Sequence, residues 1–171
     1  GKDVYVYELN PAVNHETDMY TYASGNGAGE LCRAYLQFDV SSIPATAVIL
    51  QANLGLFYSG ASGTATAGPV GAYGVTSSWD EATITWNDQP SVSSTALDTH
   101  SIPAAATNSF LFWDIKALVR YWVDGSVTNR GIALMDTDES SFEGWKGFET
   151  SDSATASQRP KLGIQYYNPA P

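Results

Sequence analysis

Cysteine is nearly absent from this chain: among its 171 residues only Cys32 carries a thiol. A lone thiol forms no intramolecular disulfide and cannot build a zinc site on thiolates. A buried core must therefore hold the fold, and a chain that is 43% hydrophobic has enough apolar side chains to form one. No base stands next to Cys32 in the sequence, so we expect a small buried hydrophobe rather than a nucleophile.

Positive charge is scarce as well. Eight Lys and Arg residues stand against eighteen Asp and Glu residues, which gives a net charge of −10 and an isoelectric point near 4.3. The electric field of such a molecule repels polyanions. We therefore expect no nucleic-acid partner.

Long apolar runs are also missing. No stretch reaches the roughly eighteen apolar residues that span a bilayer, and the chain begins on "GKDVYVY" without the charged head and apolar core of a signal peptide. We expect a mature or excised soluble domain without membrane insertion. Charged residues make up 15% of the chain, beside ten Tyr, five Trp and many Ser, Thr and Gly. This composition is typical of secreted β-domains, so we expect a secreted, extracellular or cell-surface protein.

The chain does contain a recurring alternation of apolar and polar residues in short runs, which is the pattern of antiparallel strands packed on one face. Clusters of Gly, Pro, Ser and Asn separate these runs. Together they predict an all-β fold, an antiparallel two-sheet jelly-roll β-sandwich formed by residues 1–171 as a single domain. The candidate strands are 4–9, 34–40, 48–58, 70–75, 83–86, 110–115, 131–136, 144–150 and 161–167.

One segment breaks the alternation and predicts a short helix near residues 115–124. Its apolar residues follow helical spacing and form one stripe. Asp114 is placed to cap the first turn through its carboxylate, and Gly125 is placed to end the helix. We therefore interpret Asp114 as structural rather than catalytic. The stripe consists of Ile115, Leu118, Val119 and Trp122.

The stretch "SSWDEATITWNDQP", residues 77–90, combines two tryptophans with two acids. If 83–86 is a strand, Ile84 and Trp86 share its core face, and Trp79 closes one end of the core. Asp80 and Glu81 are neighbours that would point to opposite faces, whereas glycosidase carboxylates must flank one bond. We interpret the stretch as a hydrophobic plug, with Glu81 holding a loop by accepting backbone N–H groups.

No other pattern indicates catalysis. The chain has no G-x-S-x-G elbow, and its two histidines, His15 and His100, lie in loop-like segments with nothing to mark a triad. We expect no enzyme activity.

Five stretches, running in order through almost the whole chain, resemble the DNRLRE or disaggregatase-related domain, which is grouped with carbohydrate-binding module family 96. The resemblance implies a secreted jelly-roll module within a larger multidomain protein, attached to polysaccharide lyases, hydrolases or cell-surface proteins, that binds an acidic polysaccharide such as alginate. The chain departs from the usual family pattern where "NHE", residues 14–16, stands in place of Asn-Tyr-Gly. The matching stretches are "DVYVYELNPAVN", "RAYLQFDVSSIP", "VTSSWDEATITWNDQP", "WDIKALVRYWVDGSVTNRGIAL" and "SDSATASQRPKLGIQY".

Sugar binding needs aromatic rings and polar groups that point away from the core. On the strand near 33–40, alternation turns Arg33, Tyr35 and Gln37 outward as a candidate platform. An alternative for Arg33 is a structural ion pair with Asp39 or another carboxylate. On the strand near 110–115, Phe110 and Phe112 face outward as an exposed apolar pair.

The strand near 144–150 adds two further ligand candidates. Trp145 offers another aromatic ring, and Lys146 offers positive charge, as does Arg130 elsewhere in the chain.

Acidic loops between residues 135 and 153 suggest one structural Ca²⁺, which takes six to eight oxygen ligands in tolerant geometry. Asp3 could join Asp138 and Asp152 if the two ends of the chain meet. The alternative is a solvated acidic loop, since no EF-hand spacing is present.

These observations predict a non-catalytic, monomeric carbohydrate-binding module for an extracellular polysaccharide, including an acidic, alginate-like one. The alternative is a structural or adhesive module of a cell-surface or matrix protein, stiffened by calcium and without glycan binding. A catalytic lyase domain comes last, because the chain lacks the machinery for it.

Overall fold

In the computed structural model, the residues described are 1–18, 20–26, 29–61, 66–140 and 142–169. They form two antiparallel sheets and one short α-helix, so the predicted all-β sandwich is confirmed. No helix in the described part of the chain is both long and apolar enough to cross a bilayer.

The first sheet, named here the β3 sheet, contains five strands. Its order runs from β1 through β3, β8 and β5 to β6, and every pairing is antiparallel. The strands are β1 (Lys2–Tyr7), β3 (Cys32–Gln37), β8 (Ile132–Asp136), β5 (Gly68–Gly74) and β6 (Asp98–Ile102).

The second sheet, named here the β4 sheet, is built around the longest strand, β4. In the order β2, β9, β4, β7 the strands lie side by side, and β10 pairs with the first half of β4. The two sheets join at the pair Ser24 and Cys32. The strands are β2 (Tyr20–Asn26), β9 (Phe142–Glu149), β4 (Val48–Ala61), β7 (Ser109–Asp114) and β10 (Lys161–Tyr167).

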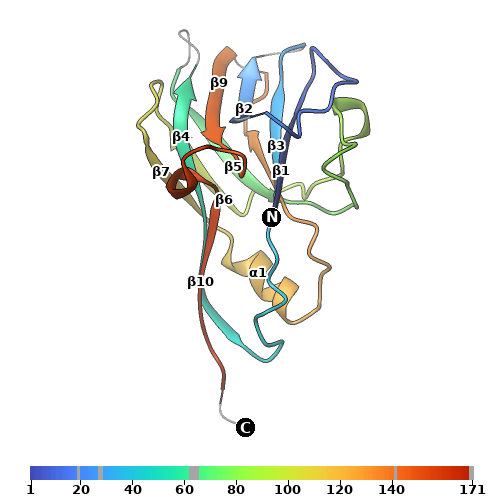
Figure 1. Cartoon of the computed structure of the whole chain (residues 1–171), viewed down its shortest axis with the longest axis vertical. Helices are drawn as coiled ribbons and strands as arrows, with labels where there is room; N and C mark the ends of the chain where they lie inside the picture. The colour runs from blue at the N-terminus through green and yellow to red at the C-terminus, as the bar shows by residue number, and fades with distance from the viewer. Residues whose placement is uncertain (19, 27–28, 62–65, 141, 170–171) are drawn as a thin grey trace.

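The path of the chain from β2 to β9 is that of a jelly roll. The order β2-β9-β4-β7 faces the order β3-β8-β5-β6, so the chain crosses repeatedly between the sheets instead of forming adjacent hairpins (Figure 1). Eight strands in two Greek keys define this fold.

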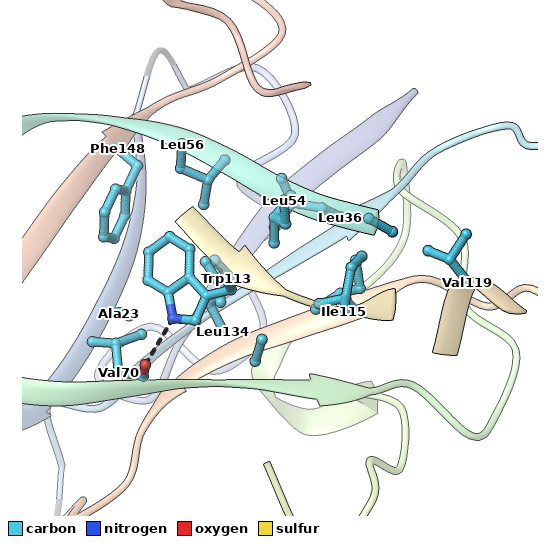
Figure 2. Close-up of a cluster of buried hydrophobic side chains, with 14 of the residues drawn as sticks. Ala23, Leu36, Leu54, Leu56, Val70, Trp113, Ile115, Val119, Leu134 and Phe148 are labelled. Atoms are coloured by element: carbon cyan, nitrogen blue, oxygen red, sulfur yellow. Dashed lines mark hydrogen bonds between the residues drawn. The ribbon is translucent and has the colours of Figure 1, made fainter. Parts of the chain in front are cut away.

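The main core fills the space between the two sheets. Trp113 lies at its centre among Leu54, Leu56 and Phe148, and its indole Nε1 donates a hydrogen bond of 2.9 Å to the carbonyl oxygen of Val70 (Figure 2). This bond satisfies the one polar atom of a buried indole while the ring fills the core.

Helix α1 (Lys116–Val123) closes the lower end of the sandwich (Figure 1). Its buried face carries Val119 and Trp122, as the helical spacing predicts. The carboxylate of Asp114 accepts the backbone N–H of Lys116 at 2.9 Å, and Gly125 ends the helix with a φ of +77°. The predicted helix is confirmed. The N-cap residue is Ile115 rather than Asp114, and Asp114 holds the helix start from one residue earlier by accepting the first helical N–H.

A second apolar cluster lies on the outer face of the β3 sheet. The segment 76–97, drawn in green to the right of β1 and β3 in Figure 1, covers this face. One buried cluster contains Ile84 of the segment together with Val4, Val6, Tyr35 and Ala133 of the sheet. The sheet is therefore apolar on both faces.

The predicted strand 83–86 is absent. Residues 81–83 form a turn, and the 3₁₀-helix η1 (Trp86–Asp88) follows. Trp79 and Trp86 are partly buried against the second cluster rather than in the main core. The prediction was wrong because four alternating residues also suit a turn, here closed by the bond from Ile84 N to the oxygen of Asp80 at 3.0 Å.

Candidate functional site

The outer face of the β4 sheet carries aromatic side chains. Leu54 and Leu56 on β4 and Trp113 on β7 face the core, so alternation turns Phe57 and Phe112 outward. Phe110, two residues from Phe112, shares this face. The predicted outward orientation of Phe110 and Phe112 is confirmed.

Three phenylalanines form what we name the phenylalanine cluster: Phe57, Phe110 and Phe112. The centroids of Phe57 and Phe110 lie 5.4 Å apart in an edge arrangement, and those of Phe110 and Phe112 lie 6.0 Å apart. Phe112 is 47% exposed. The Nζ atom of Lys161 on β10 lies 3.4 Å from the centroid of Phe110, a cation–π contact that places one positive charge beside the rings.

Trp145 and Tyr22 extend the aromatic surface toward β2. Trp145 is 37% exposed on β9 and meets the ring of Tyr22 at a centroid distance of 5.2 Å. Tyr22 in turn contacts the edge of Tyr5, on which His15 stacks at 4.2 Å. The hydroxyl of Tyr5 donates to Asp18 at 2.9 Å, and burial together with this carboxylate raises the pKa of Tyr5 above its ordinary value.

Glycines beneath the rings keep this surface flat. A Cβ atom at Gly55 would lie 2.8 Å from the ring of Phe112, and one at Gly60 would lie 3.3 Å from the ring of Trp145. At Gly147 it would lie 3.0 Å from Tyr22. The rings therefore rest against bare backbone, and any side chain at these positions would lift them.

Amide side chains border the rings on the β10 side. Gln51 and Asn53 alternate with the buried Ala52 and Leu54, and Gln165 pairs with Gln51 across the two strands. Within the described part of the chain, Gln51, Asn53 and Gln165 make no side-chain hydrogen bond. Each amide thus keeps free donors and acceptors beside the rings.

We name this surface the aromatic face. Its members are Tyr22, Gln51, Asn53, Phe57, Phe110, Phe112, Trp145, Lys161 and Gln165. Flat rings flanked by hydrogen-bonding groups suit an extended ligand with apolar C–H faces and many hydroxyls.

Sequence reasoning missed several of these residues. Phe57 could have been found, because the alternation that buries Leu54, Leu56 and Tyr58 turns it outward. Tyr22 and Lys161 carry no such signal, since their positions depend on strand pairings between distant segments.

Arg33, predicted for ligand binding, is held in a structural network. Its guanidinium donates to both oxygens of Glu139, at 2.7 and 2.6 Å, and to Gln89 at 2.8 Å. It also lies 4.9 Å from the ring centroid of Trp86. The Glu139 carboxylate raises the pKa of Arg33. The geometry of Arg33 therefore matches the alternative interpretation, a structural ion pair, and its partner is Glu139 rather than Asp39.

Tyr35 is fully buried, which corrects the expectation of an exposed platform ring. Alternation does turn it away from the main core, but the segment 76–97 covers it, with Trp79 at a centroid distance of 6.0 Å. Its hydroxyl donates to Gln89 at 3.1 Å, and burial raises the pKa of Tyr35 to about 12. Gln37 is partly buried and donates to the carbonyl oxygen of Asn129 at 2.9 Å.

Lys146 is also fully buried, which corrects its expected role as a surface charge. It pairs with Ala23 of the core, so its side chain enters the sandwich, where Nζ lies 3.3 Å from Asp136. Because Trp145 faces outward, its neighbour on β9 must face inward.

The three carboxylates expected to hold calcium do not come together. Asp3 is opposite Leu36 in the β3 sheet, whereas Asp138 follows Asp136 beyond the far end of β8. The Asp3 carboxylate accepts the N–H of Ser151, next to Asp152, at 2.8 Å. Within the described ranges, no three His, Cys, Asp or Glu side chains are grouped to hold a metal ion. Calcium binding stays a prediction.

Burial raises the pKa of Asp3, and the neighbouring Asp152 carboxylate adds to the effect. Glu81 accepts the backbone N–H of Asp3 at 2.6 Å, so its predicted role in holding a loop is confirmed. Cys32 is buried, as expected.

A comparison with family models gives one match that covers nearly the whole chain. The model described as carbohydrate-binding module family 96 matches residues 1–166. No curated protein matches the chain.

Proposed function

Because this chain belongs to carbohydrate-binding module family 96, we propose that its aromatic face binds an extended polysaccharide chain. The observation that carries the proposal is the set of exposed aromatic rings, chiefly Phe112 and Trp145, which pack against Gly55 and Gly60. A pyranose ring has an apolar face that stacks on an aromatic ring, while its hydroxyls need directional partners. Gln51, Asn53 and Gln165 supply such partners.

The shape of the surface favours a polymer over a small sugar. The phenylalanine cluster and Trp145 lie on the same sheet face and on different strands, so one ligand must extend across β7, β4 and β9 to touch both. A flat site of this kind binds weakly per ring and gains strength from contact length. Its purpose is to hold an attached catalytic or surface domain close to the polymer by raising the effective concentration.

We also propose that acidic, alginate-like polymers are among the ligands. Lys161 supports this, because an ammonium group beside the rings can pair with a uronate carboxylate. The proposed setting is extracellular or on the cell surface, within a larger protein and as a monomer. The low charge and high Ser, Thr, Gly and Tyr content support that setting.

Retention of the protein in polysaccharide-containing native gels tests the proposal. Wild-type protein is compared with Phe112→Ala and Trp145→Ala on a panel of neutral and acidic polysaccharides. We expect each variant to bind about two- to tenfold more weakly, from the roughly 0.5–1.5 kcal/mol of one aromatic contact. Tyr121→Ala removes a ring of similar exposure from α1 and should bind like wild type.

Two results would contradict the proposal. Undiminished retention of both ring variants would move the site away from the aromatic face. Absence of retention on every polysaccharide would favour the structural or adhesive alternative.

A further inference from the structure

A cavity lies on the opposite side of the molecule, outside the β3 sheet where β1 begins and β3 ends. Its volume is 220 Å³, and it is lined by Lys2, Gln37, Ser78, Trp79, Thr128, Asn129 and Arg130. This space exceeds that of several waters, at about 30 Å³ each, yet it is smaller than the roughly 300 Å³ at which drug-sized pockets begin. It suits a single sugar unit.

The cavity continues on both sides. A neighbouring hollow of 550 Å³ shares Lys2, Gln37 and Asn129 with it. Another of 470 Å³ shares Ser78 and Trp79. The three hollows are adjacent because they share these lining residues, and we refer to them together as the groove.

Two cations, Lys2 and Arg130, line the central cavity, and the carboxylate of Glu81 interacts with Lys2 at longer range than a salt bridge. In a protein of net charge −10, neither Lys2 nor Arg130 takes part in any ion pair within the described part of the chain. The Nε atom of Arg130 is buried and has no hydrogen-bond acceptor. An unsatisfied buried donor on a charged group is unfavourable until an acceptor arrives.

Trp79 fixes the arrangement. Its Nε1 donates to the carbonyl oxygen of Arg130 at 2.7 Å, and the Nζ atom of Lys2 lies 5.6 Å from its ring centroid. Trp79 therefore contacts both cationic residues, the backbone of Arg130 and the side chain of Lys2. Three carboxylates line the two outer hollows: Asp39 accepts the N–H of Ser41, Asp80 accepts the N–H of Ala82, and Asp88 accepts the hydroxyl of Thr85. Among the described residues that line the central cavity, Lys2 and Arg130 carry charge and none is a carboxylate.

We propose that this groove is a second binding site, separate from the aromatic face, for an anionic sugar unit of a polysaccharide. Lys2 and Arg130 bind the carboxylate or sulfate, and the side chains of Gln37, Ser78 and Asn129 meet the hydroxyls. Arginine matches the paired oxygens of such groups in a bidentate way. The inference rests on the proposed function, and it makes the module two-sided, with one chain segment on each outer sheet face.

Calorimetric titration with three oligosaccharides of equal length tests this site: a uronate, a sulfated and a neutral one. The variants Lys2→Gln and Arg130→Gln remove one charge each, and Lys116→Gln removes the same charge from the exposed surface of α1. We expect the two groove variants to lose at least about tenfold in affinity for an anionic oligosaccharide. Binding of the neutral one, and all binding by Lys116→Gln, should stay unchanged. The uronate and sulfated arms identify which anion is bound.

The outcomes separate this inference from the proposed function. If Phe112→Ala weakens anionic binding while Arg130→Gln does not, the aromatic face serves both ligands and the second site is refuted. If the neutral oligosaccharide or polymer binds and neither anionic one does, the groove inference alone fails. If nothing binds, the proposed function fails as well. Unchanged melting temperatures of the groove variants establish that charge, and not folding, is responsible for a loss.

Discussion

Trp145 and Lys146 are neighbours on β9, yet one is exposed to solvent and the other is sealed inside the sandwich. In a strand, one step along the chain reverses the face to which a side chain points. Sequence reasoning could assign both residues to a strand, but it named both as surface ligands. Because side chains alternate along a strand, only one of the two can face solvent. Lys146 is opposite the buried Ala23, so Lys146 faces the core and Trp145 faces solvent.

Tyr35 shows a different limit at the scale of one residue. Alternation along β3 correctly turned it away from the main core, but alternation does not say whether the outer face is open. The covering segment begins about forty residues later in the chain, at residue 76, and nothing in the strand itself announces it. Phe110 and Phe112 follow the same rule on a sheet face that no described segment covers, so their predicted outward orientation was confirmed.

Asp3 gives a pH-dependent prediction. The residue is only 4% exposed, and burial raises the pKa of its carboxyl above 3.8. A group whose pKa is higher in the folded state binds protons more tightly there, so its protonation stabilises the fold at low pH. That contribution is lost as the pH rises from 3.8 through the raised value. We expect Asp3→Asn, which cannot ionise and keeps an acceptor for Ser151, to gain stability relative to wild type across this window.

Urea unfolding of both proteins between pH 3 and 7 measures the effect as the difference in unfolding free energy. Asp80→Asn, at an exposed carboxylate, serves as the control and should show no such gain. A difference that does not vary with pH would show that Asp3 is not the titrating group.

At the scale of elements, the helix was the most predictable part. Helical spacing, an acidic residue ahead of the first turn and a glycine after the last one are local signals, and all three agree with α1. β2 and β6 were missed, because the second half of Tyr20–Asn26 and most of Asp98–Ile102 consist of small or polar residues and look like loops. Their strand structure comes from their neighbours in the sheets.

The cap of α1 supports a second prediction. Asp114→Ala removes the acceptor for the N–H of Lys116 and should lower the unfolding free energy by about 1 kcal/mol, within the usual range of roughly 0.5–2. Polysaccharide binding should stay as it is in wild type. Thermal unfolding and gel retention together check this. Loss of binding at an unchanged melting temperature would place Asp114 in a ligand site.

At the scale of the whole molecule, resemblance and strand count predicted the jelly roll, but not which of its outer faces is open. The β3 sheet is covered and carries a groove, whereas the β4 sheet presents the aromatic face. This difference depends on which sheet the long connection 76–97 packs against. Long-range contacts set that position, and no local sequence pattern predicts it.

Calcium remains a prediction for the molecule as a whole. An ion that binds only the folded state stabilises it by RT ln(1 + [L]/Kd), about 2.7 kcal/mol when calcium is at 100 times Kd. We expect chelation to lower the melting temperature and millimolar calcium to restore it. Asp152→Asn should weaken the response if the region around Asp3 and Ser151 holds the ion. An unchanged melting curve, together with no metal in elemental analysis, would leave only solvated acidic loops.

The pairing of β2 with β9 has a consequence for how the protein is made. Between Asn26 and Glu149 lie most of the residues of the chain, yet Tyr20 of β2 is opposite Glu149 of β9. A ribosome adds roughly 5–20 residues per second, so β2 waits on the order of ten seconds for its partner. Until then its backbone N–H and C=O groups are open to strands of other chains. Slow, non-local closure of this kind predicts that the yield of soluble protein depends on synthesis rate and temperature more than on final stability.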